Sequence, residues 1–234
     1  MQFDIHTHTI ASGHGTSCTI ADMAKAGRAA GLSLVGITDH GPATMGAGTP
    51  SYFRSLAMAP HDRCGIRLLY GVELNILDHK GNVDLDDEIL SHLDYAISSM
   101  HTKNKKPGTR EENTEAYIAA MKHPKVRLIG HCDDSRYPVD YQALVQAAKE
   151  HHVLLELNEA SLTPGGYRGD TRENNLEMLK WCRTFRHPIV LSSDSHGPEK
   201  VGQFPYGLAL LDEINFPQQL VLNYRLRELL KFLS

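Results

Sequence analysis

The sequence has few cysteines, no long apolar run and no excess of positive charge. Its four cysteines in 234 residues form no Cys-x-x-Cys pair, which argues against a zinc ribbon or a disulfide framework. No apolar run approaches the roughly 20 residues that cross a bilayer, and the polar N-terminus does not resemble a signal peptide. The net charge of -4 gives no electrostatic reason to expect nucleic acid or a membrane surface as partner. We therefore expect a cytoplasmic protein.

Short apolar segments recur along the chain and alternate with helical patterns. They are rich in Val, Ile, Leu or Tyr and cover residues 3–6, 34–39, 67–74, 95–101, 126–131, 153–158 and 189–194. Strands that alternate with helices predict a parallel sheet. No linker or change in composition divides the chain, so we expect one α/β domain, residues 1–234, closed into a distorted seven-stranded TIM-like barrel. A flat doubly wound sheet is the alternative.

Capping residues mark the start of three predicted helices. Thr19 is expected to cap the start of an amphipathic segment, residues 19–30, that Gly31 is expected to end. Asp140 and Thr171 are placed to cap two later helices.

Histidine is frequent, with 14 residues, and half of them follow predicted strands. His6 and His8 stand two residues apart at the end of the first strand, so their side chains point to the same face. Asp194 and His196 repeat this spacing after the last strand. The side chains that complete the pattern are His14, His40, Glu73, His101 and His131.

In a parallel barrel the carboxyl ends of all strands meet at one rim, where active sites lie. Imidazole and carboxylate ligands suit Zn, Fe, Mn or Ni, so we predict a metal centre built from these nine side chains. The other histidines precede strands or lie within helices and are expected to be structural: His61, His79, His92, His123, His151, His152 and His187.

Six of these segments resemble the signature motifs of the PHP (polymerase and histidinol phosphatase) superfamily. They are His6-Thr7-His8, Thr38-Asp39-His40, Gly71-Val72-Glu73, His101, Gly130-His131 and Ser193-Asp194-Ser195-His196. The match runs through essentially the whole chain, and the sequence resembles the YcdX-like phosphatases in particular. The resemblance implies a distorted seven-stranded barrel, a trimeric assembly and three divalent metal ions, usually zinc, with Mn or Fe as alternatives.

The resemblance also implies how the ligands are shared. One ion would be held by His6, His8, Glu73 and Asp194, a second by His14, His40 and His196, and a third by Glu73, His101 and His131. Glu73 would therefore bridge two ions. The family commonly has proline after the fifth-strand histidine, whereas this chain has Cys132. That thiol either perturbs the loop, adds a soft ligand or is a spectator.

The charge of such a centre favours an anionic substrate. Metal-bound histidines are neutral, so Glu73 and Asp194 would leave a formal charge of about +4 on three divalent ions. We expect hydrolysis of a small phosphomonoester by a metal-bridging hydroxide, with no side-chain nucleophile. Arg168 would clamp phosphate or be a solvated loop residue, and Asp39 would orient an imidazole or cap a loop. Nearby lysines would attract anions or be solvated: Lys103, Lys105 and Lys106.

Three alternatives stay open from the sequence. Amidohydrolases also begin with His-x-His, but they usually have eight strands and a carboxylated lysine after strand four, where this chain has His101. A non-catalytic metal-binding PHP module is the second, although such modules lose ligands and every ligand position is filled here. Nuclease activity is the third, and the absence of a basic stripe weakens it.

Overall fold

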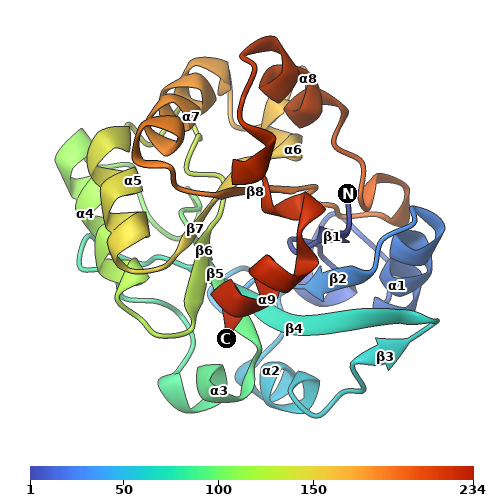
Figure 1. Ribbon diagram of the computed structural model, residues 1–234. Helices are drawn as coiled ribbons and strands as arrows, with labels where there is room; N and C mark the ends of the chain where they lie inside the picture. The colour runs from blue at the N-terminus through green and yellow to red at the C-terminus, as the bar shows by residue number, and fades with distance from the viewer.

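Seven parallel strands form a nearly closed barrel in the computed structural model, which describes residues 1–234 (Figure 1). In the order in which they pair, they are β1 (Phe3–Asp4), β2 (Leu34–Ile37), β4 (Ile66–Asn75), β5 (Tyr95–Ser99), β6 (Val126–Ile129), β7 (Leu154–Asn158) and β8 (Ile189–Ser192). The predicted fold class, the seven parallel strands and the barrel are confirmed.

One strand was not predicted. The short β3 (Asp62–Arg63) pairs antiparallel with the start of β4. The two residues of the connecting turn, Cys64 and Gly65, have positive φ values of 54° and 75°. A two-residue turn of this kind matches the twist of a hairpin, and Cys-Gly lacks the usual Asn or Asp at the first position.

The barrel closes between its first and last strands. Beyond both strands, Thr7 and Ser195 form a single parallel bridge, and the N–H of His8 donates to the Ser195 carbonyl at 2.9 Å. At the other end, the buried Asn223 side chain joins the two strands. Its amide oxygen accepts from the Leu191 N–H at 2.8 Å, and its amide nitrogen donates to the Phe3 carbonyl at 3.2 Å.

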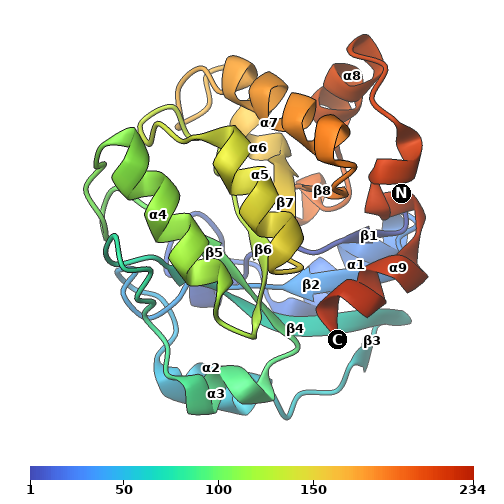
Figure 2. The ribbon, with the colours of Figure 1, turned by 60° about the vertical axis from the view of Figure 1, so that its left-hand side comes forward.

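Helices cover the outer face of the barrel, and the last of them crosses one end of it (Figures 1 and 2). They are α1 (Ile20–Ala29), α2 (Pro50–Leu56), α3 (Asp87–His92), α4 (Arg110–Met121), α5 (Tyr141–Glu150), α6 (Glu159–Leu162), α7 (Arg172–Phe185), α8 (Pro205–Glu213) and α9 (Leu226–Leu233). Thr19 and Asp140 cap α1 and α5 as predicted. Thr171 precedes α7 but does not cap it, because its hydroxyl donates to the Ser161 carbonyl at 2.9 Å instead. No helix combines the length and the apolar character that a membrane span requires.

Alternating strand residues divide the core into two parts. Leu68 and Tyr70 of β4 belong to the large cluster between strands and helices, whereas Leu69 belongs to a cluster of 12 buried residues inside the barrel. The inner cluster includes Leu229 and Leu233 of α9, which are four residues apart and so share one helix face. α9 therefore closes the amino end of the barrel and leaves the carboxyl end for the site.

The histidines predicted to be structural lie outside the site, with one positional correction. His79 follows β4 at the carboxyl end of the barrel, not at the other rim as predicted. Its side chain is exposed and belongs to no group of candidate ligands.

Candidate metal centre

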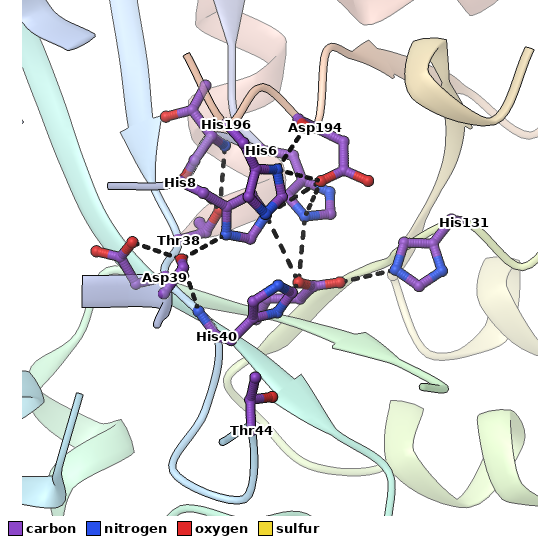
Figure 3. A network of polar contacts seen from close by, with 12 residues as sticks. His6, His8, Thr38, Asp39, His40, Thr44, His131, Asp194 and His196 are labelled. Atoms are coloured by element: carbon purple, nitrogen blue, oxygen red, sulfur yellow. Dashed lines mark hydrogen bonds and ion pairs between the residues drawn. The ribbon is translucent and has the colours of Figure 1, made fainter. Parts of the chain in front are cut away.

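The nine predicted ligand side chains all lie at the carboxyl end of the barrel. Figure 3 shows the side chains of His6, His8, His40, His131, Asp194 and His196 pointing toward one another. Four of the nine stand two residues beyond a strand's last residue, where the predicted strands extended too far: His6, His101, His131 and Asp194. At His131 and Asp194 the backbone leaves the extended conformation, with φ values of 29° and 52°. Such strained backbone is typical of functional sites.

Glu73 is the centre of the arrangement, and its two carboxylate oxygens face different imidazoles. The distances from Oε2 are 2.6 Å to His40 Nδ1, 3.5 Å to His6 Nε2 and 3.6 Å to His8 Nε2. The distances from Oε1 are 2.8 Å to His131 Nε2 and 3.3 Å to His101 Nε2. A carboxylate that presents one oxygen to each of two ligand groups has the geometry of a bridging ligand.

Asp194 supplies a second carboxylate on the opposite side of the first two histidines. Its Oδ1 lies 3.1 Å from His8 Nε2 and 3.7 Å from His6 Nε2. Three sets of ligand atoms approach one another within 4.8 Å: His6, His8 and Asp194; His8, His40 and His196; and His40, Glu73 and His101.

This grouping differs from the implied one in three respects. Glu73 is absent from the first set, and His40 stands in the third set, where His131 was expected. His8 stands in the second set, where His14 was expected. The His14 side chain is exposed, and its ring centre lies 4.9 Å from that of His40 and 5.3 Å from that of His196. His14 is therefore close to the second set, at its solvent side.

Four of the histidines have a hydrogen-bonded Nδ1 and a free Nε2, as metal ligands do: His6, His8, His101 and His196. The inner nitrogens have no hydrogen-bond partner although they are buried: Nε2 of His6, His8, His101 and His196, and Nδ1 of His40. Glu73 Oε2 is also without a hydrogen bond, although it lies 2.6 Å from His40 Nδ1. Buried polar atoms left unpaired are costly, and divalent cations bound in the three sets of ligand atoms would satisfy them. The residues present thus fit metal ions.

Asp39 supports His8 through a serine. His8 Nδ1 lies 2.8 Å from Ser12 Oγ, and this hydroxyl donates to Asp39 Oδ1 at 2.7 Å. The serine must then accept the Nδ1 proton, which leaves the His8 Nε2 lone pair for a metal. Asp39 also accepts from the backbone N–H of Thr9 at 2.6 Å and from the Tyr52 hydroxyl at 2.6 Å. Both sequence-based roles of Asp39, orienting an imidazole and tying a loop, have contacts in the structure.

Glu156 was not predicted as a site residue, and it lies fully buried in β7 behind the centre. Its Oε1 is 2.7 Å from His6 Nδ1, and its Oε2 accepts from the backbone N–H of His131 at 2.7 Å and from Asn158 at 2.9 Å. One carboxylate thus orients two candidate ligands. The available signal was a lone charged residue in an otherwise apolar buried strand, which needs a partner.

The pKa shifts of the two carboxylates and of His8 suit metal binding. His6 differs, because the charges of Glu156, Asp194 and Glu73 outweigh burial and raise its pKa well above the ordinary value. Burial favours the protonated acid, yet the charges of His40 and His101 hold the pKa of Glu73 well below its ordinary value. His6 and Arg168 likewise outweigh burial and hold the pKa of Asp194 well below its ordinary value. Burial and neighbouring imidazoles lower the pKa of His8. Ionised carboxylates and neutral imidazoles are the forms that bind divalent metals.

Arg168 reaches the centre from the loop after α6. Its Nη2 lies 2.8 Å from Asp194 Oδ2, and its Nη1 donates to Ser161 Oγ at 3.2 Å. The side chain is only 12% exposed, so it is not a solvated loop residue.

Cys132 and Lys105 have partners away from the metal centre. The Cys132 thiol points into the core against Met178 Sδ at 3.6 Å, and burial raises its pKa. Lys105 is buried and donates to Asn113 Oδ1 at 3.2 Å. Neither side chain belongs to a candidate ligand set, which favours the spectator role for the thiol.

Comparison with known proteins places this geometry in context. A profile of the PHP domain matches residues 4–160. A protein of Acetivibrio thermocellus named "Probable phosphatase" is 41% identical over 220 residues, covering 94% of this chain and 90% of that protein. A "Probable phosphatase" of Caldicellulosiruptor saccharolyticus is 37% identical over 233 residues, covering 100% and 96%. The structure of histidinol phosphate phosphatase from Lactococcus lactis, complexed with zinc, L-histidinol and phosphate, has the same fold, with a TM-score of 0.61, 16% identity, and coverage of 92% and 94%.

Proposed function

This chain belongs to the PHP domain family, and on that premise we propose that it is a metal-dependent phosphatase of small phosphomonoesters. The observation that carries the proposal is the set of buried, unpaired imidazole nitrogens around Glu73. The relatives named as phosphatases span nearly the whole chain, and the solved phosphatase of the same fold holds zinc and phosphate.

We infer a centre for three divalent ions, most simply zinc, held by the nine predicted residues. His8 would contribute to the second ion as well as the first, because it belongs to both sets of ligand atoms. When bound, such ions supply the nucleophile by lowering the pKa of water and stabilise the attacking and leaving oxygens. The trimeric assembly implied by the resemblance stays a prediction.

The metal-loaded centre keeps a positive formal charge when Glu156 is counted. This carboxylate adds one negative charge behind His6, and Arg168 adds one positive charge beside Asp194. These two charges cancel, and the buried Asp39 behind His8 removes one more, so the formal charge with three divalent ions is about +3. An excess of this size favours a dianionic phosphate over a neutral amide, which supports a phosphatase over an amidohydrolase.

A phosphate-release assay on the metal-loaded protein tests the proposal. We expect hydrolysis of phosphomonoesters, loss of activity after chelation, and recovery on addition of Zn, Mn or Fe. The same protein should leave cyclic amides intact. Turnover of the amides alone would contradict the proposal in favour of an amidohydrolase. A protein that carries three metals per chain but is inert on a broad phosphate panel would be a non-catalytic module.

Arg168 is proposed to bind the substrate phosphate while it anchors Asp194. Arg168→Gln should raise KM and the inhibition constant of inorganic phosphate by about 10- to 100-fold, because charge-assisted hydrogen bonds are lost. Steady-state kinetics with parallel metal analysis measure this. Arg172→Gln is the control, since Arg172 is an exposed arginine paired with Glu213. Loss of metal with an unchanged KM would mean that Arg168 only anchors Asp194.

A further inference from the structure

A second polar cavity lies at the amino end of the barrel, opposite the metal centre. Its volume is about 700 Å³, and its walls come from α9, the carboxyl end of α5 and the amino ends of β6 and β8. Figure 1 shows α9 crossing this end of the barrel. None of the lining residues belongs to the metal centre, so the cavity is a separate site.

The side chains that line the cavity carry more positive than negative charge. Arg225 pairs with Glu228, Nη1 lying 2.9 Å from Oε2, and Glu228 is the one carboxylate side chain in the lining. Arg127 and Lys231 also line the cavity, and neither has a carboxylate side chain as partner. Lys231 is therefore a permanent cation with no partner, and Arg127 contacts only the main-chain oxygen of Ser234, the last residue described.

The two arginines also have unused hydrogen-bond donors. The Nε atoms of Arg127 and Arg225 are buried and have no acceptor in the chain. Arg127 Nη2 donates to the Ser234 main-chain oxygen at 3.2 Å, which occupies only part of its guanidinium. Planar guanidinium groups match the oxygens of phosphate and carboxylate, and an anion in the cavity would supply both the charge and the acceptors.

The apolar side chains that line the cavity indicate that the bound anion also has an apolar part. Leu220, Leu222 and Phe232 contribute apolar surface, and the Phe232 ring lies edge-on to His152 with ring centres 6.5 Å apart. We propose that this cavity binds a small organic phosphate, its phosphate on Arg127 and Lys231 and its apolar or aromatic part against Phe232. This inference does not rest on the proposed catalytic function.

Calorimetric titration of the metal-loaded protein with phenylphosphonate tests the proposal. Phenylphosphonate joins a dianion to an aromatic ring through a C–P bond, which is not a phosphoester. We expect two binding events per chain, one at each end of the barrel. Lys231→Gln should weaken one event about tenfold, the effect of one charge-assisted hydrogen bond, and the double variant Arg127→Gln, Lys231→Gln should abolish it. Phosphatase activity should be unchanged in both.

Two controls assign the events. Lys122→Gln removes an exposed lysine that does not line the cavity and should change neither event. Glu73→Gln should remove the event at the metal centre and retain the event at the cavity. Because Lys231 is exposed on α9, its variant should fold even where the Arg127 variant does not. A titration in which no binding event is weakened by Lys231→Gln would overturn the proposal, whereas the absence of the event at the metal centre alone would count only against the proposed function.

Discussion

Glu73→Gln is expected to lower kcat/KM by about a thousandfold or more and to release or disorder metal at two positions. The loss of an outer partner of a metal ligand typically costs 10- to 100-fold, and Glu73 faces five imidazoles directly. Glutamine has one acceptor oxygen and no charge. Its amide N–H groups would donate to the ring nitrogens that should bind metal. Metal content by mass spectrometry and steady-state kinetics measure both effects.

Glu159→Gln is a matched control for this variant. Glu159 is a buried carboxylate like Glu73, but it accepts from the backbone N–H groups of Tyr206 and Gly207 at 2.9 and 2.8 Å. These contacts hold the start of α8 and involve no candidate ligand, so metal content should stay at the wild-type level. Full activity of Glu73→Gln with unchanged metal content would contradict the bridging role.

Which residues meet at the candidate site could be predicted from the sequence, because the barrel fold determines where the strand ends lie. A parallel barrel brings the carboxyl ends of all its strands to one rim, so the order of residues along the chain is enough to collect His6, Glu73, His131 and Asp194. Their side chains lie within a few ångströms of one another. Long-range geometry was not needed for this step.

How the ligands are grouped was less predictable, because it depends on the direction of each ring. His8 points between two sets of ligand atoms, since Ser12, held by Asp39, fixes its outer nitrogen. His14 lies in a loop that leaves its side chain exposed. A sequence gives the spacing of these residues but not the loop conformation. The hairpin of β3 and β4 was not predicted for the same reason. Its turn requires a positive φ at Cys64, and cysteine is not a residue type that indicates such a turn.

The omission of Glu156 has a different origin. A search for strand ends finds residues that touch the metal, whereas Glu156 lies inside β7 and acts through its neighbours. Burying a carboxylate among Leu154, Leu155 and Leu157 is unfavourable unless donors satisfy it. Each oxygen has such a donor here. A charged residue within an apolar strand is therefore a signal for a positioning residue, here Glu156, which orients His6 and His131 through hydrogen bonds.

Glu156→Gln is accordingly expected to weaken metal binding and to lower activity by about 10- to 100-fold at limiting metal. The carboxylate accepts from His6 Nδ1 on one oxygen and from the His131 and Asn158 N–H groups on the other. A glutamine must turn its NH₂ group toward one of these donors, so either His6 or His131 loses its orientation. Competition with a chromogenic chelator gives the metal dissociation constants, and kinetics are measured across metal concentrations.

Rescue by metal separates positioning from simple loss of structure. Excess metal should restore most of the activity of Glu156→Gln, because the ligands themselves remain, but should restore little to Glu73→Gln, which lacks one. Glu150→Gln, an exposed glutamate on α5, should behave like wild type. If the Glu156 variant bound metal normally and still lost activity, its carboxylate would act on the reaction and not through His6 and His131. A lowered melting temperature without rescue would instead indicate a structural role for the charge inside the barrel.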